Sequence, residues 1–181
     1  MSGKPVVYWD ASAFIALLKG EDSHGPDVAQ ALRSQAGAFD RGEIIIATST
    51  VGLAEVFCAN ISHVGMERFE QMIRRKNFLP VAVNDSIARD AARLRSHCHR
   101  LAKSQSTGDP YLLAMPDAIH VATAMRIKAD VLVTTDTKDK LVEAKRRDLG
   151  MTQVSRYYPV PDLYPVPIRL PELGLLGTGL L

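Results

Sequence analysis

The chain has 181 residues, a length that suits one domain with a substantial hydrophobic core. Charged residues make up 23% of the sequence and the formal net charge is only +2, which does not by itself indicate nucleic-acid binding. The N-terminal stretch has no long apolar run, so we expect neither a signal peptide nor a membrane anchor and place the protein in the cytoplasm. Cys58 and Cys98 form no CxxC pair, and we expect both to be buried free thiols in apolar helical stretches.

The first half of the chain alternates between short apolar runs and helical stretches. A β-rich run, PVVYW, is followed directly by Asp10, and a helix is predicted over 12–19. A second helix is predicted over 26–36, opened by a proline. The apolar run 43–47 is typical of a strand that is covered on both faces, and N-cap candidates at 48–50 begin a helix that reaches Ile61.

The same alternation continues to about residue 157. The remaining predicted elements are, in chain order, a helix over 65–76, a strand over 78–83, a helix over 85–103, a polar loop over 104–109, a helix opened by Met115-Pro116-Asp117, a strand over 131–134, a helix over 138–147 and a strand over 152–157. Strands separated by helices indicate an α/β protein with a parallel sheet between two helical layers.

The C-terminal region has a different composition. Prolines exclude helix from residue 158 onward, and glycines follow near the end, at Gly174, Gly177 and Gly179. We therefore interpret 1–157 as the domain and 158–181 as a Pro/Gly-rich extended tail, not as a second domain.

Four acidic residues are predicted at one edge of this sheet. Ligands of parallel α/β sheets bind beyond the carboxyl ends of the strands. Asp10 and Asp136 follow predicted strands, Asp117 lies in the first turn of a helix, and Glu55 lies in the helix that leaves the strand 43–47. Taken singly, Asp10 could be an ordinary helix cap and Asp117 an ordinary first-turn acid, so only their joint placement indicates a site.

Carboxylates gathered in this way repel one another unless cations lie between them. Hard oxygen ligands suit Mg²⁺ or Mn²⁺, which also bind phosphate oxygens. Two such ions can activate a water molecule and stabilise the leaving oxygen when a phosphodiester is cleaved. The acids therefore predict a metal site for phosphodiester chemistry.

Four stretches of this chain carry most of the predicted site: YWDASAFIALL, TSTVGLAEVF, PDAIHVATAM and VLVTTD. In order and type they resemble the signature segments of PIN domains, and of VapC-type toxins in particular. The resemblance covers about residues 5–157. It implies a three-layer α/β/α fold with a central parallel sheet of four or five strands. It also implies that the catalytic, metal-binding acids are Asp10, Glu55, Asp117 and Asp136.

The resemblance also suggests supporting residues. Thr134 matches a hydroxyl position that commonly supports the site, and Ser12 follows the first acid where small polar residues are common. Asp139 either contacts a metal through water or begins the next helix. The segment after Asp136 reads TKDKL where the family often has a large apolar residue, so we expect a different local loop.

Candidate RNA contacts lie on the helix predicted over 85–103. Basic residues recur opposite its apolar stripe: Arg89, Arg93, Arg100 and Lys103. They could track a phosphate backbone or simply form a solvated face, and the sequence leaves both readings open. His120, three residues after Asp117, could approach the site, and we expect it to pack or form hydrogen bonds rather than bind metal.

The resemblance implies a Mg²⁺/Mn²⁺-dependent endoribonuclease. It would be the toxin of a type II toxin–antitoxin pair, a homodimer that a small antitoxin protein silences, with no membrane association. The alternatives are a non-catalytic PIN module that binds RNA or protein, and an RNA-processing PIN nuclease that is not a toxin. The intact set of four acids argues against the non-catalytic module.

Overall fold

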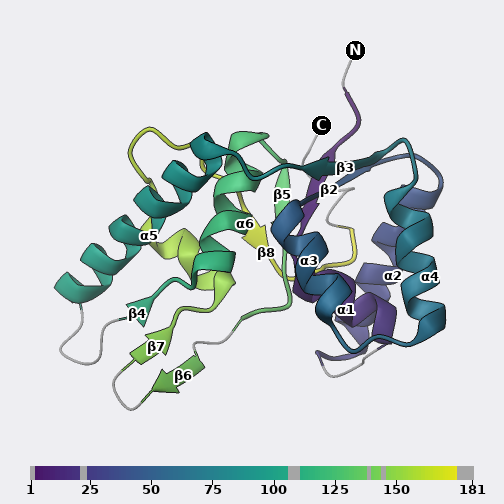
Figure 1. Ribbon diagram of the computed structural model, residues 1–181, viewed down its shortest axis with the longest axis horizontal. Coiled ribbons are helices and arrows are strands. Elements are labelled where there is room, and N and C mark those ends of the chain that lie inside the picture. Colours follow the sequence, from purple (N-terminus) through teal and green to yellow (C-terminus); the bar gives the residue numbers. More distant parts are fainter. Residues whose placement is uncertain (1–2, 21–23, 106–110, 138–139, 144–145, 175–181) are drawn as a thin grey trace.

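A parallel sheet forms the centre of the molecule. The computed structural model describes residues 3–20, 24–105, 111–137, 140–143 and 146–174. The sheet has five strands in the order β3-β2-β1-β5-β8, and every neighbouring pair is parallel. In chain order these strands are β1 (Val6–Trp9), β2 (Ile45–Ser49), β3 (Phe78–Val81), β5 (Val131–Val133) and β8 (Ile168–Arg169). Helices cover both faces (Figure 1), which confirms the predicted three-layer α/β/α fold.

The central strand β1 serves two hydrophobic cores. Successive side chains of a strand point to opposite faces of the sheet. Val7 and Trp9 therefore enter one core, Tyr8 enters the other, and none of the three is exposed to solvent. This placement explains why the β-rich run that precedes Asp10 has almost no polar residue.

The helices divide between these cores. The core that contains Trp9 is covered by α1 (Ala11–Lys19), α2 (Pro26–Asp40), α3 (Thr50–Cys58) and α4 (His63–Ile73). The core that contains Tyr8 is covered by α5 (Asp85–Gln105), α6 (Met115–Arg126) and the 3₁₀ helix η1 (Met151–Tyr157). The helix α6 packs against both α5 and α3, so it lies between them (Figure 1). None of the helices in the described ranges is long and apolar enough to cross a membrane.

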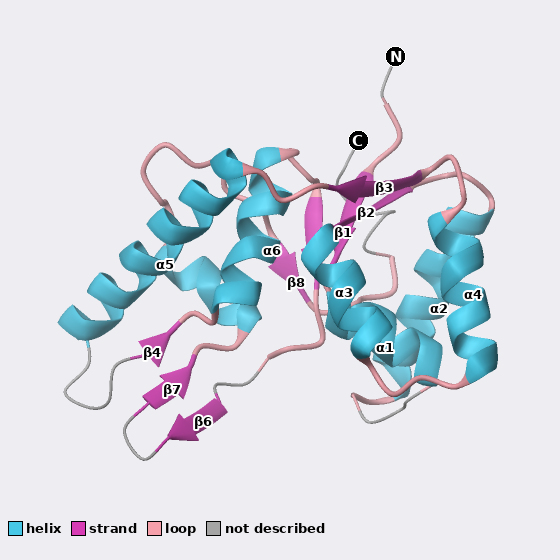
Figure 2. Cartoon of the chain, in the orientation of Figure 1, coloured by secondary structure: helices cyan, strands magenta, loops and turns pink. Residues whose placement is uncertain are grey.

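Two of the predicted elements are wrong. The helix predicted over 138–147 is replaced by β6 (Lys140–Glu143) and β7 (Arg146–Asp148), which pair antiparallel and join β4 (Tyr111–Leu112) in a small second sheet (Figure 2). The segment has too few apolar residues for a helical stripe, and its backbone bonds to neighbouring strands instead.

The strand predicted over 152–157 is also wrong, because η1 occupies this stretch. Its buried residues are Met151, Val154 and Tyr157. A repeat of three residues is the period of a 3₁₀ helix, in which residues three apart lie above one another.

Burial of one cysteine was predicted wrongly as well. Cys98 is buried, but Cys58 is exposed at the end of α3, and both are free thiols. The buried side of that helix carries Val56, whereas Phe57 and Cys58 both lie on its exposed side.

The C-terminal region is packed against the domain. Of the predicted tail, residues 158–174 are described, and they contribute β8 to the central sheet next to β5. Val160, Val166 and Ile168 lie in the core that contains Tyr8. This segment therefore completes the sheet on the side of β5.

Candidate active site

Asp10 occupies the carboxyl end of the central strand. It follows β1 directly and caps α1, where its side chain accepts a hydrogen bond from the backbone N–H of Ala13 at 2.9 Å. Capping satisfies a backbone donor that the first turn of a helix leaves free. The carboxylate is nevertheless almost completely buried, with 3% of the residue exposed. A simple cap on the protein surface does not need this burial.

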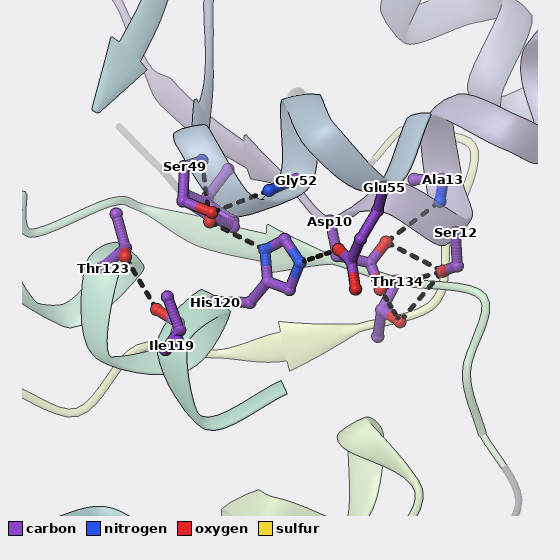
Figure 3. Close-up of polar contacts among 11 residues, drawn as sticks. Asp10, Ser12, Ala13, Ser49, Gly52, Glu55, Ile119, His120, Thr123 and Thr134 are labelled. Carbon is purple, nitrogen blue, oxygen red and sulfur yellow. Dashed lines mark hydrogen bonds and ion pairs between the residues drawn. The ribbon is translucent and has the colours of Figure 1, made fainter. Parts of the chain in front are cut away.

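Hydroxyl groups surround the Asp10 carboxylate. Ser12 Oγ donates to both of its oxygens, at 2.8 and 2.9 Å, and Thr134 Oγ1 donates to one of them at 2.7 Å. Each hydroxyl also accepts a backbone N–H, from Thr135 to Ser12 and from Asp136 to Thr134, both at 2.9 Å. Figure 3 shows the hydroxyl groups on one side of the carboxylate. The carboxyl ends of β1 and β5 are thus joined by one hydrogen-bonded cluster.

Burial affects the ionisation of Asp10. It raises the pKa of Asp10 above the ordinary value, because removal of water disfavours the charged carboxylate. The electrostatic influence of His120 and hydrogen bonds from Thr134, Ala13 and Ser12 lower the pKa of Asp10 and only partly offset burial. A cation beside Asp10 would oppose the effect of burial, because it stabilises the charged form.

Glu55 reaches the same region from α3. Its Oε2 lies 2.7 Å from His120 Nε2, and His120 Nδ1 lies 2.8 Å from the hydroxyl oxygen of Tyr8. That oxygen also accepts the backbone N–H of Ser49 at 3.0 Å. In Figure 3, Glu55 extends between His120 and Asp10. The prediction that His120 forms hydrogen bonds is confirmed, and its partners are Glu55 and Tyr8.

Tyr8 and Ser49 are not among the site residues predicted from the sequence. The sequence predicts Tyr8 as part of an apolar strand and Ser49 as a cap candidate, a role that Ser49 has on α3. A tyrosine inside a strand that is buried on both faces gives a usable signal, because its hydroxyl group must find a partner in the core. Which residue becomes that partner, however, depends on packing between distant segments.

Asp117 and Asp136 lie on neighbouring segments. Asp117 is half-buried in the first turn of α6, one helical turn before His120. Asp136 follows β5, is also half-buried, and is tied to Thr134 through its backbone. In the described part of the chain, no three His, Cys, Asp or Glu side chains are close enough together to hold a metal ion. Asp139 lies outside the described residues.

The side chains at this site offer the kind of ligand atoms that bind a hard divalent cation. Asp10 and Glu55 offer carboxylate oxygens, which Mg²⁺ and Mn²⁺ prefer. The desolvated Asp10 carboxylate is the observation that favours a cation here. Asp117 and Asp136 stand on the adjoining segments and would complete the oxygen donors.

The basic residues predicted to contact RNA lie on α5. All four are exposed, and Arg89 forms an ion pair with Asp85 at 2.8 Å. Arg93 and Arg100 line a cavity of about 370 Å³ between α5 and the segment 160–162. In Figure 1, α5 lies beyond α6 as seen from α3. A role in RNA binding for these residues therefore stays a prediction.

The fold and the site define an α/β/α protein with a buried carboxylate at the carboxyl end of its central strand. The PIN domain family matches residues 7–145, which is most of the chain. The chain therefore belongs to the PIN domain family, as the resemblance suggested. A search of curated proteins finds no match.

Solved structures share this fold. VapBC2 from Rickettsia felis, in a crystal structure with a DNA fragment from its promoter, has a TM-score of 0.53 and 12% identity, and the match covers 91% of this chain and 98% of that chain. DNA-bound VapBC from Salmonella typhimurium has a TM-score of 0.52 and 14% identity, with 92% and 98% covered. At these identities the likeness shows the fold alone.

Proposed function

We propose that the protein is a Mg²⁺- or Mn²⁺-dependent endoribonuclease that hydrolyses RNA phosphodiester bonds. The observation that carries this proposal is the buried carboxylate of Asp10, which three donors hold at the carboxyl end of β1. Membership of the PIN domain family supports it.

Four acids would hold the metal and act in catalysis: Asp10, Glu55, Asp117 and Asp136. When bound, the ions would supply a Lewis acid and lower the pKa of a water molecule. Ser12 and Thr134 orient the Asp10 carboxylate, because each donates to it while its own oxygen is fixed by a backbone N–H. Asp139 stays a predicted supporting acid.

The protein would act as the toxin of a type II toxin–antitoxin pair. The two solved structures described above are of VapBC2 and VapBC, and this supports a small antitoxin protein as partner. A homodimer in the cytoplasm is part of the same proposal. Co-expression with the product of an adjacent small reading frame, followed by gel filtration, tests the partner.

The test of the nuclease is RNA cleavage by the full chain with Mn²⁺ or Mg²⁺, with EDTA, and with Asp10→Asn or Glu55→Gln. We expect EDTA and either substitution to abolish most of the cleavage. Glu67→Gln is the matched control, because Glu67 is an exposed acid on the neighbouring helix α4, and this variant should cleave normally. Cleavage that survives both EDTA and Asp10→Asn would refute the proposal.

A non-catalytic PIN module predicts a different result. Such a protein would bind RNA or a partner protein without cleaving RNA and without binding Mn²⁺ at millimolar concentration. The desolvated Asp10 carboxylate favours the metal-dependent enzyme over this alternative.

A further inference from the structure

We propose that Tyr8 and His120 are positioning residues that orient Glu55 for metal binding. They connect the backbone of Ser49 to the Glu55 carboxylate through three hydrogen bonds, of 3.0, 2.8 and 2.7 Å. This inference rests on the proposed function, because it takes Glu55 as a metal ligand.

We infer the direction of the bonds from the two ends, because the Ser49 N–H can only donate and the Glu55 carboxylate can only accept. The Ser49 backbone N–H can only donate, so the hydroxyl oxygen of Tyr8 is an acceptor in that bond. The Tyr8 hydroxyl hydrogen is then available for His120 Nδ1. Tyr8 is completely buried, and a phenol is neutral at pH 7, so the hydroxyl group keeps this hydrogen.

The tautomer of His120 follows in turn. Because Nδ1 accepts from Tyr8, the ring hydrogen of the neutral imidazole lies on Nε2 and is donated to Glu55 Oε2. One carboxylate oxygen of Glu55 is thereby fixed, and the other is left for a cation. Hydrogen bonds of this kind orient metal-binding carboxylates in other sites.

The position of the His120 ring is fixed by close packing. The side chain is only 2% exposed, whereas the side chain of Glu55 is 36% exposed. At Gly52, on α3, a Cβ atom would lie 2.8 Å from His120 Cε1 and 2.5 Å from Thr48 Oγ1. Glycine at this position therefore lets the ring approach the backbone of α3. We therefore infer that the packed His120 ring fixes the position of the more exposed Glu55 carboxylate.

A purely structural role makes a different prediction. If His120 only filled space in the core, an apolar residue of similar size would replace it without loss. If it positions Glu55, the residue must keep a donor at the place of Nε2. Comparison of His120→Gln with His120→Leu separates these roles, because the glutamine amide can donate there and leucine cannot.

The experiment measures Mn²⁺ binding to the metal-free full chain by titration calorimetry, without RNA. We expect Tyr8→Phe and His120→Leu to weaken binding by about tenfold or more, and His120→Gln to recover part of the loss. Thr123→Val is the matched control, because it also removes a buried hydroxyl group, which donates to the Ile119 carbonyl of the same helix (Figure 3). It should bind Mn²⁺ like the wild type.

A second measurement does not depend on metal. Nitrogen NMR of the wild-type ring should show hydrogen on Nε2 of His120 and none on Nδ1, and Tyr8→Phe should shift the Nδ1 resonance. Melting temperatures identify any variant that fails to fold, in which case the NMR result and the remaining variants decide.

The outcomes separate the two proposals. If the wild type binds Mn²⁺ and the Tyr8 and His120 variants bind it equally well, the positioning role is overturned and the nuclease proposal stands. Hydrogen on Nδ1, or His120→Leu binding as well as His120→Gln, also overturns the positioning role. If the wild type itself binds no Mn²⁺, the metal-dependent function fails first, and the positioning role falls with it.

Discussion

Thr134 Oγ1 donates a hydrogen bond of 2.7 Å to Asp10 and accepts one of 2.9 Å from the backbone N–H of Asp136. Thr134 is completely buried, so neither bond is replaced by water. One hydroxyl group therefore sets the position of two of the four candidate acids relative to each other. This relationship makes Thr134 a sensitive position to test.

Replacement of Thr134 by valine should destabilise the protein and impair the site. The change leaves the Asp136 N–H without its acceptor and removes a donor from Asp10, for a cost of about 1–3 kcal/mol in the free energy of unfolding. Mn²⁺ binding should weaken by about tenfold. Urea unfolding and calorimetry measure the two effects. Thr134→Ser retains the hydroxyl group and should resemble the wild type, and an equal loss in both variants would contradict this reasoning.

Asp10→Asn should stabilise the metal-free protein at neutral pH. Burial raises the folded-state pKa of Asp10 above its unfolded value of about 4, so the protonated carboxyl group is the form that favours folding. That contribution is present below the unfolded pKa and is lost as the pH rises through the raised folded pKa. A neutral asparagine avoids this loss of stability. The variant should therefore be more stable than the wild type at neutral pH, and the difference in stability should become smaller as the pH falls.

Thermal unfolding in EDTA at several pH values measures this difference. Added Mn²⁺ should raise the melting temperature of the wild type much more than that of Asp10→Asn, because a ligand stabilises the state that binds it. A variant that is less stable than the wild type across the whole pH range would show that the Asp10 hydrogen bonds outweigh its desolvation.

Gly52→Ala should displace His120 and Thr48. The added methyl group would lie within 3 Å of both side chains, and overpacking of this kind costs about 1–3 kcal/mol in stability. We also expect weaker Mn²⁺ binding, because His120 is bonded to Glu55. The matched control is Gly37→Ala in α2, where the nearest atom, at 3.3 Å, belongs to the flexible side chain of Arg41. Chemical denaturation should show that this control is neutral or slightly stabilising.

Arg93 and Arg100 provide the test of the predicted RNA contacts. If α5 binds RNA, replacing both by glutamine should weaken RNA binding several-fold and make it less dependent on salt, with kcat unchanged. Arg41→Gln serves as control, because Arg41 is exposed and pairs with Glu43. Binding curves at several salt concentrations distinguish the two readings, and unchanged curves would assign the α5 arginines to a solvated face.

The elements that could be predicted from the sequence are those that local patterns determine. Apolar runs of β1 and β2, caps such as Ser49 and the proline that opens α6 are all visible within a few residues. The acids and the Ser12 and Thr134 hydroxyl groups were placed by the resemblance to a family together with the rule for parallel sheets.

Other features depend on partners that are distant in the sequence. Tyr8 and His120 are 112 residues apart, and no local pattern connects them. The strands β6 and β7 form through pairing of β7 with both β6 and β4, and no pattern within the segment indicates these partners. The two residues of β8 lie among prolines, and only their pairing with β5 makes them a strand.

The strand β8 determines where the chain can be shortened without loss of part of the central sheet. In β5, Leu132 donates its backbone N–H to the Pro167 carbonyl. Thr134, which follows β5, donates its backbone N–H to the Arg169 carbonyl at 3.1 Å. A shortened chain that ends near residue 157, at the end of the domain predicted from the sequence, would leave this strand edge open. Open edges recruit other strands, so such a protein would tend to self-associate and would hold the Thr134 hydroxyl group less firmly. Low solubility or weak metal binding in a truncated version would thus reflect the missing edge strand and not the chemistry of the acids.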